Sequence, residues 1–301
     1  MKIGLALGSG SARGWAHIGV IEGLAELGIT PSIICGSSIG ALVGAAYVSG
    51  KLDRLRERVL GLTRLNMAMY FHVRLSGRGV VSKKKLHAFL ADCVSEEGRL
   101  IESLPLRYAA VATELKTGRE FWFRTGPVLD AVWASIALPG LFPPVAAGNR
   151  WLLDGGLVNP VPVSVCRALG ADTVIAVNLN GDVLGRHLRP HDESRTEGGF
   201  PYVHQHDGLG KIPSLFGTVA SAVDIVQDRI TRSRMAGDPP DILLAPRLSH
   251  MGLLDFYRAE ESIREGRACV MRMQSGIETL FGSEMGKTMS ESFDWRQDFH
   301  C

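Results

Sequence analysis

A serine at position 38 lies in a sequence context that could make it a nucleophile. The apolar run 33–35 predicts a buried strand, residues 36–40 (Gly-Ser-Ser-Ile-Gly) fit the pattern G-x-S-x-G, and the small apolar residues up to 48 predict a buried helix. A serine at a sharp strand-to-helix turn exposes its hydroxyl, and the helix N-terminus beside it favours negative charge. A plain glycine turn with an N-cap serine fits the same residues, so this motif alone leaves both interpretations open.

A glycine-rich turn at 8–14 (Gly-Ser-Gly-Ser-Ala-Arg-Gly) separates a predicted strand over 3–7 from a predicted helix over 15–27. The backbone N–H groups of such a turn can bind an anion. A dinucleotide-binding loop would need an acidic residue at the end of the second strand, and here that strand ends in Cys35 and the serine turn. An oxyanion hole fits better, because the serine motif follows on the next strand. A turn without a ligand is the remaining interpretation.

Asp154 ends a predicted strand over 151–153 and is followed by two glycines. The glycines let the backbone turn sharply, so this carboxylate could face Ser38 across the sheet and accept its proton. An Asx-type turn is the purely structural alternative. A triad would need a histidine on a suitable loop, and His17, within the first predicted helix, fits packing or helix capping better.

The elements that must position these residues alternate along the chain. We predict further helices over 51–64, 83–94, 128–134, 214–235 and 257–280, and further strands over 106–114, 120–124, 171–179 and 241–245. The first two of these strands form a predicted hairpin. Alternating strands and helices are typical of a mostly parallel sheet that helices cover. We therefore predict an α/β fold, a three-layer sandwich with a mostly parallel central sheet and helices on both faces.

Three segments depart from this pattern. Residues 65–75 are rich in methionine and aromatic side chains, which fits core packing better than a lid or a lipid-facing patch. In residues 180–213 an irregular, flexible composition favours a solvated insertion over a metal cluster, although four histidines lie there: His187, His191, His204 and His206. Residues 283–301 are polar and predict a disordered tail. We therefore expect a single domain over 1–282.

The composition limits the classes of function. The 301 residues are 46% hydrophobic and 21% charged, which suits a globular protein with a core, and the net charge of +2 does not favour a nucleic-acid partner. Five scattered cysteines without a C-x-x-C pair argue against a disulfide framework or a zinc site and favour a reducing compartment. We see no signal-peptide pattern and no run of 18 apolar residues that would predict a transmembrane helix.

Together, the motifs at 8–14, 36–40 and 154–156 resemble the patatin-like phospholipase family, and in particular its bacterial subgroup related to neuropathy target esterase. Similar stretches lie at 16–20, 112–118, 134–140, 159–162, 228–230 and 246–248. The resemblance implies that Ser38 is the nucleophile and Asp154 its base. It also implies an oxyanion loop, formed by Gly10, Ser11, Ala12 and Arg13. Family loops are often all glycine before the alanine, and here Ser9 and Ser11 replace two glycines while keeping the N–H groups.

The resemblance implies a serine acyl hydrolase that acts on fatty acyl esters, lysophospholipids among them, through an acyl-enzyme. It implies no cofactor and no metal. Its partners would be the lipid or acyl ester substrate and, transiently, a membrane surface, in a cytoplasmic protein at the inner membrane face. One alternative is a non-catalytic regulatory or scaffold protein that retains the fold. The other is a nucleotide-binding protein, against which the missing acidic residue argues.

Overall fold

The structure is a computed structural model that describes residues 1–65, 83–181 and 215–291. An eight-stranded sheet has the order β5-β6-β3-β2-β1-β7-β8, and β4 pairs with β3 off this path. The strands are β1 Ile3–Leu7, β2 Ile33–Ser37, β3 Arg107–Glu114, β4 Glu120–Phe123, β5 Val145–Ala147, β6 Arg150–Asp154, β7 Thr173–Val177 and β8 Ile242–Leu244. Strands β3, β2, β1, β7 and β8 run parallel, whereas β4, β5 and β6 pair antiparallel. The predicted mostly parallel sheet is confirmed.

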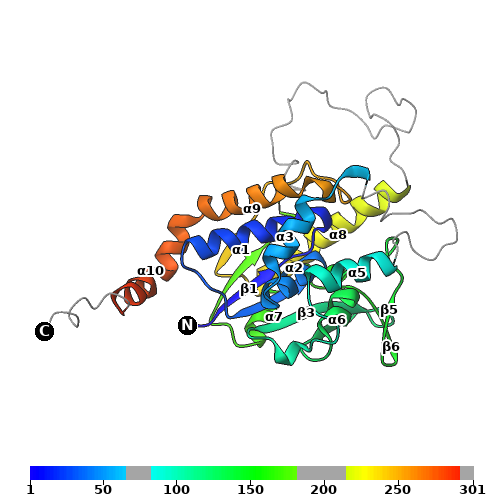
Figure 1. Ribbon diagram of the computed structural model, residues 1–301, viewed down its shortest axis with the longest axis horizontal. Helices are drawn as coiled ribbons and strands as arrows, with labels where there is room; N and C mark the ends of the chain where they lie inside the picture. The colour runs from blue at the N-terminus through cyan, green and yellow to red at the C-terminus, as the bar shows by residue number, and fades with distance from the viewer. Residues whose placement is uncertain (66–82, 182–214, 292–301) are drawn as a thin grey trace, which may run out of the picture.

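Helices cover both faces of this sheet. The helices of the described residues are α1 Ala16–Glu26, α2 Ile39–Val48, α3 Leu52–Leu60, α5 Lys83–Cys93, α6 Val128–Ser135, α7 Val163–Ala168, α8 Leu215–Gly237, α9 Ala259–Arg272 and α10 Gln274–Glu291, the last of which extends away from the sheet (Figure 1). Side chains of a strand alternate between the faces, and β1 sends Leu5 and Leu7 into the larger core with α1, α2 and α9, while Ala6 joins a smaller core with α7. Helices α1 and α9 lie side by side on one side of the sheet, and α7 lies on the other (Figure 1).

The register of strand β3 brings the two key strand ends together. On one side β3 pairs in parallel with β2, and Ser37 lies opposite Val111. On its other side β3 pairs antiparallel with β6, and Asp154 lies opposite Ala112. Strands β2 and β6 therefore both end beside the middle of β3, from opposite directions, and this is why the residues after β2 can meet Asp154.

Contact between α1 and α9 depends on glycine at two positions. A Cβ atom on Gly19 would lie 1.9 Å from the carbonyl oxygen of Ile263, and one on Gly266 would lie 2.0 Å from that of Ala16. Such distances exclude any side chain, so both helices need glycine for their backbones to touch. This close packing fixes α9 behind the turn that connects β1 to α1.

Several predicted elements match the structure and a few do not. The hairpin is confirmed as β3 and β4. The predicted helix over 257–280 is wrong as one element, because α9 ends at Arg272 and α10 begins at Gln274. Helix α10 continues to Glu291, into the stretch 283–301 for which we predicted a disordered tail. Strand β5 was not predicted. Of the segments with special composition, most of 65–75 and of 180–213 lies outside the described residues.

No helix in the described ranges has the combination of length and hydrophobicity that a membrane-spanning segment needs.

Candidate active site

Ser38 sits alone between β2 and α2 in a strained backbone conformation. Its φ of 55° and ψ of −124° lie where a residue with a side chain is rarely found. The two motif glycines make this turn possible, since a Cβ on Gly36 would lie 2.4 Å from the Ala41 nitrogen and one on Gly40 would lie 2.1 Å from the Leu7 oxygen. The G-x-S-x-G pattern is therefore the sequence of a sharp strand-to-helix turn, with both glycines required by contact.

The hydroxyl of Ser38 is hydrogen-bonded to Asp154. Ser38 Oγ donates to Asp154 Oδ2 at 2.5 Å, and the Gly156 N–H donates to Asp154 Oδ1 at 2.7 Å. Asp154 is 1% exposed. Both carboxylate oxygens are therefore engaged, one by the serine and one by the backbone of its own turn, so the carboxylate is held facing the serine.

Burial raises the pKa of Asp154 to about 7, while the hydrogen bonds from Ser38 and Gly156 act in the opposite direction. Desolvation disfavours the charged carboxylate, whereas donors to its oxygens favour it, and here burial is the larger effect. A carboxylate with a pKa near neutral pH is a far better proton acceptor than one with an ordinary pKa. The buried position thus gives this side chain the proton affinity that a general base needs.

Two further polar side chains hold this pair in place. Ser135, at the end of α6, accepts a hydrogen bond from the Ser38 N–H at 2.9 Å and donates to the Val111 oxygen at 2.6 Å. Thr113 donates to the backbone oxygen of Asp154 at 2.8 Å. Neither residue was predicted as part of the site. The signal in the sequence was a polar residue among apolar residues at the end of a predicted helix or strand; both side chains are buried in the fold, where a hydrogen-bond partner is required.

The predicted oxyanion loop lies beside the pair. Gly10 and Ser11 line the same cavity as Ser38 and Asp154. Among the described residues, none accepts a hydrogen bond from the N–H of Gly10 or Ser11, whereas the Ala12 N–H donates to the Leu253 oxygen at 3.2 Å. The first residue of α2, Ile39, also has an N–H without an intrahelical acceptor, next to the serine. The N–H of Ala12 is therefore engaged by Leu253, whereas Gly10 and Ser11, which line the cavity, have no acceptor for theirs among the described residues.

Ser11 has a φ of 51°, in the region that favours glycine. Its hydroxyl donates to the Leu253 oxygen at 2.7 Å. A serine therefore replaces glycine here at the cost of strain, and its hydrogen bond to a distant loop offsets part of that cost.

Arg13 is buried and turned toward the loop itself. Its backbone N–H donates to the Gly10 oxygen at 3.2 Å, and so does its Nε, also at 3.2 Å. Its Nη2 donates to Asp224 at 2.7 Å. The Arg13 side chain is thus engaged in holding the loop from behind.

His17 is fully buried beneath the same loop. Its Nε2 lies 2.7 Å from the Gly8 oxygen, and burial lowers its pKa to about 4. The ring is therefore neutral at physiological pH and bonded to backbone. The structure places it in packing, as the sequence analysis favoured, and brings no histidine of the described residues into contact with Ser38.

The cavity beside Ser38 has an almost entirely apolar wall. Its side chains come from α2, α5, α8 and the loops after α6 and before α9, and include Leu42, Leu86, Phe89, Leu141, Phe142 and Phe256. Within the described part of the chain, no lysine or arginine lines it. The cavity therefore offers space for a hydrocarbon chain and, among the described residues, no cationic side chain for a head group.

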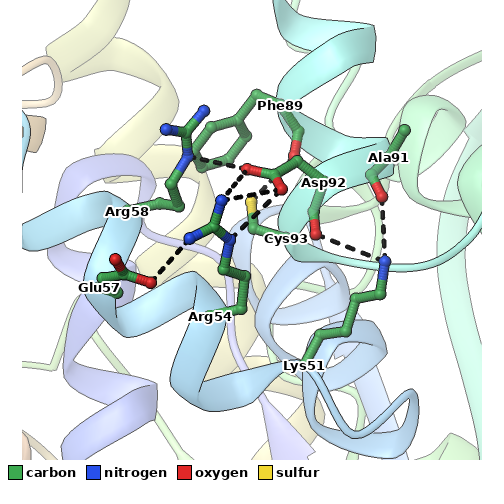
Figure 2. A network of polar contacts seen from close by, with 8 residues as sticks. All are labelled: Lys51, Arg54, Glu57, Arg58, Phe89, Ala91, Asp92 and Cys93. Atoms are coloured by element: carbon green, nitrogen blue, oxygen red, sulfur yellow. Dashed lines mark hydrogen bonds and ion pairs between the residues drawn. The ribbon is translucent and has the colours of Figure 1, made fainter.

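Helix α5, which contributes Leu86 and Phe89 to this wall, is fastened to α3 by charged side chains (Figure 2). Asp92 of α5 accepts hydrogen bonds from Arg54 at 3.1 Å and forms an ion pair with Arg58 at 2.9 Å.

Lys51 extends the same network. Its Nζ donates to the Ala91 oxygen at 3.0 Å, near the C-terminal end of α5, where a cation is favoured. Together these contacts give one wall of the cavity a second anchor besides its apolar packing.

In the part of the chain that the structure describes, no three histidine, cysteine, aspartate or glutamate side chains gather in a way that could hold a metal ion. The four histidines between 187 and 206 lie outside the described residues.

The chain thus combines an α/β sheet with a serine at a strand-to-helix elbow, the arrangement in which serine hydrolases present their nucleophile. Residues 5–167 match the sequence model described as patatin-like phospholipase. The chain belongs to the patatin-like phospholipase family, and the resemblance noted from its motifs is confirmed.

Similar proteins fall in the expected subgroup. An uncharacterized NTE family protein of Mycobacterium tuberculosis is 32% identical over 335 residues, and the match covers 92% of each chain. Lysophospholipase NTE1 of Coccidioides immitis is 28% identical, over 88% of this chain and 17% of that protein. Among solved structures, VipD from Legionella pneumophila is 12% identical with a TM-score of 0.47, over 91% of this chain and 66% of that one.

Proposed function

We propose that this protein is a serine acyl hydrolase that cleaves fatty acyl esters through an acyl-enzyme. The observation that carries the proposal is the 2.5 Å hydrogen bond from Ser38 Oγ to the buried Asp154 carboxylate. A serine hydroxyl is a weak nucleophile unless an adjacent base takes its proton. Family membership supports hydrolysis of lipid esters in general, and this pair supplies the more specific chemistry.

In the first half-reaction, Ser38 Oγ attacks the ester carbonyl carbon and its proton passes to Asp154 Oδ2. The carbonyl oxygen becomes an oxyanion, which the N–H groups of Gly10 and Ser11 stabilise together with that of Ile39. When the tetrahedral intermediate collapses, the bond to the alcohol breaks and Asp154 returns the proton to the leaving oxygen. The products of this half are the free alcohol and an acyl group on Ser38.

In the second half-reaction, Asp154 takes a proton from water, which attacks the acyl carbonyl carbon. The same N–H groups stabilise the second oxyanion. Collapse breaks the bond to Ser38 Oγ, which recovers its proton from Asp154, and releases the fatty acid. Asp154 thus acts as base and then as acid in each half-reaction, while Ser38 is the nucleophile, and no histidine is needed.

The substrate class follows from the cavity. Its apolar wall would bind one fatty acyl chain, with the scissile carbonyl beside Ser38 and the head group outside. Because a relative is named as a lysophospholipase, monoacyl phospholipids are the first substrates to test. Transient contact with a membrane surface and a cytoplasmic location remain predictions from the sequence.

Covalent labelling tests the proposal directly. A fluorophosphonate should label the wild-type protein at Ser38, and Ser38→Ala should abolish labelling. A panel of esters with increasing chain length should then show turnover that depends on the acyl chain. If the folded wild-type protein is neither labelled nor active on any ester of the panel, the proposal fails and the non-catalytic scaffold becomes the better explanation.

A further inference from the structure

Two side chains of α8 form hydrogen bonds with the glycine-rich loop. Asp224 accepts a hydrogen bond from Arg13 Nη2 at 2.7 Å. Gln227, three residues later on the same helix, accepts one from Ser9 Oγ at 2.9 Å. Residues three apart lie on one face of a helix, so α8 presents both side chains to the loop at once. Helix α8 lies outside residues 5–167, the part that matches the family.

The contact through Arg13 acts on one particular peptide bond. Arg13 Nε donates to the Gly10 oxygen at 3.2 Å, so the guanidinium links that oxygen to Asp224. The Gly10 carbonyl and the Ser11 N–H belong to the same planar trans peptide and point in opposite directions. When Arg13 holds the carbonyl away from the cavity, the Ser11 N–H must point toward it.

The charges make this link strong. The Arg13 side chain is 2% exposed and that of Asp224 is 18% exposed, so the ion pair lies largely out of water. A hydrogen bond between two charged groups is stronger than a neutral one, and a buried guanidinium without its carboxylate would be left unpaired. Asp224 therefore determines where Arg13 can lie, and thereby the orientation of the peptide.

The second contact fixes the residue before Gly10. Gln227 Oε1 accepts from Ser9 Oγ and also from Asn180 Nδ2, in each case at 2.9 Å. All three side chains are buried, with exposed fractions of 5% or less for Gln227, Ser9 and Asn180. The serine that replaces a family glycine at position 9 is thus tied to α8 by its hydroxyl.

We infer that Asp224 is a positioning residue for the oxyanion hole, acting through Arg13 on the Gly10–Ser11 peptide, and that Gln227 supports it through Ser9. This inference rests on the proposed function. Helix α8, from the second half of the chain, thereby completes the geometry of a loop that lies at residues 8–14.

The test compares Asp224→Asn with Asp228→Asn. Asp228 lies one turn further along α8, is buried, and pairs at 2.7 Å with Arg232 of the same helix rather than with the loop. We expect Asp224→Asn to lower kcat on a short-chain aryl ester by about 10- to 100-fold, because the loss of one oxyanion donor costs about 10²–10³. KM should change little, and Asp228→Asn should leave kcat within about twofold of wild type.

A second measurement reports on the oxyanion itself. A trifluoromethyl ketone adds to Ser38 Oγ and forms a tetrahedral oxyanion, so its affinity should fall in Asp224→Asn by about the same factor as kcat/KM. Asp224→Glu, which keeps the carboxylate, should recover part of both losses. If Asp224 had a purely structural role, Asp224→Asn and Asp228→Asn would both lower thermal stability. Neither kcat nor the affinity for the ketone would then fall more in Asp224→Asn than in Asp228→Asn.

If Asp224→Asn does not fold, Ser9→Ala provides a second test. The Ser9→Ala substitution removes one hydroxyl and leaves no buried charge unpaired. This variant should lower kcat severalfold with KM unchanged. A kcat equal to that of wild type in both folded Asp224→Asn and folded Ser9→Ala would overturn the role of α8. If Asp224→Asn does not fold, a wild-type kcat in Ser9→Ala would overturn it. A loss of kcat in Asp228→Asn as large as that in Asp224→Asn would overturn it as well. A wild-type protein without esterase activity would refute the proposed function instead.

Discussion

At the scale of single residues, strain and hydrogen bonding are combined at Ser38. A residue with a side chain in this backbone region costs roughly 1–2 kcal/mol, and the surrounding contacts must compensate for it. The Ser135 hydroxyl accepts the Ser38 N–H at 2.9 Å, and the neighbouring glycines allow the helix to pack directly on the strand ends. The result is a hydroxyl that stands clear of its own backbone and meets the carboxylate of Asp154.

The pair itself can be tested by substitution. Asp154→Asn keeps the shape of the side chain but removes the proton acceptor, so kcat should fall by about 10⁴-fold, as when a triad member is disabled. Ser38→Ala should be about equally damaging, and the double variant little worse than either, because the two residues act as one unit. The measurement is kcat on a short-chain aryl ester, with circular dichroism to confirm folding.

His17→Gln is the matched control for the pair. The ring contacts the Gly8 oxygen and packs beneath the loop, so a folded variant should retain much of the activity. If Asp154→Asn stayed within about tenfold of wild type while folded His17→Gln were inactive, a histidine base would replace the pair.

The pH dependence of the reaction follows from the pKa of Asp154, which burial raises to about 7. The carboxylate can accept the proton of Ser38 only when it is ionised. We therefore expect kcat/KM to fall about tenfold for each pH unit below the pKa and to reach a plateau above it. A profile that is flat from about pH 5 to pH 9 on a non-ionising ester would contradict this assignment.

At the scale of elements, helix α5 connects the charged network to the cavity. Asp92 holds two arginines of α3, and Leu86 and Phe89 of the same helix line the wall. Asp92→Asn should loosen this wall and raise KM severalfold for long-chain esters, with little change for short ones, which do not reach α5. Since these side chains are partly exposed and screened by water, the loss of stability should be small.

Glu57→Gln provides the comparison for Asp92. Glu57 also pairs with Arg54, at 2.8 Å, but it is exposed and belongs to α3 (Figure 2). Its variant should leave the chain-length dependence unchanged. Equal effects of Asp92→Asn on short and long esters, or equal effects of the two variants, would show that the network does not shape the cavity.

The elements that local sequence determines were predicted well. Strand β1, the elbow after β2 and the hairpin follow from short apolar runs and turn residues, which act over a few neighbours. The antiparallel direction of β6 and the short strand β5 depend on pairing with distant parts of the chain or with each other. Sequence periodicity contains no information about such partners.

The candidate site likewise combines residues that local motifs predict with residues that only distant contacts identify. Ser38 and Asp154 could be predicted from the sequence because each lies in a recognisable motif. Ser135 lies 97 residues from Ser38, and Asp224 lies 211 residues from Arg13. Nothing in the sequence near Asp224 marks it as a partner of the loop, so only the folded arrangement could identify it.

At the scale of the whole molecule, the second half of the chain encloses the site built by the first. The Leu253 oxygen accepts hydrogen bonds from the Ser11 hydroxyl and the Ala12 N–H. Ser262 of α9 donates to the Arg13 oxygen at 2.9 Å. The loop at 8–14 therefore depends on α8, α9 and the segment between β8 and α9, and a chain cut after the family-matching region would lack these supports.

The stability of the whole molecule should also reveal the cost of the buried base. The folded pKa of Asp154 is about 7, above its ordinary value of 3.8, so the native state binds a proton that the unfolded state has already lost. Stability therefore falls as pH rises between these two values and stays reduced above the folded pKa. The linkage predicts a penalty of about 4 kcal/mol at alkaline pH.

Asp154→Asn should lack this penalty, because its neutral amide is never desolvated as an ion. We expect the variant, although inactive, to be more stable than wild type by a few kcal/mol at about pH 8, with the difference shrinking toward about pH 4. His17 contributes the opposite trend, since its pKa is lowered to about 4 and stability is lost as pH falls below 6.5. That contribution is common to both proteins and cancels in their difference. Urea unfolding of both proteins across this pH range is the measurement, and parallel stability curves would show that Asp154 is not a buried base with a raised pKa.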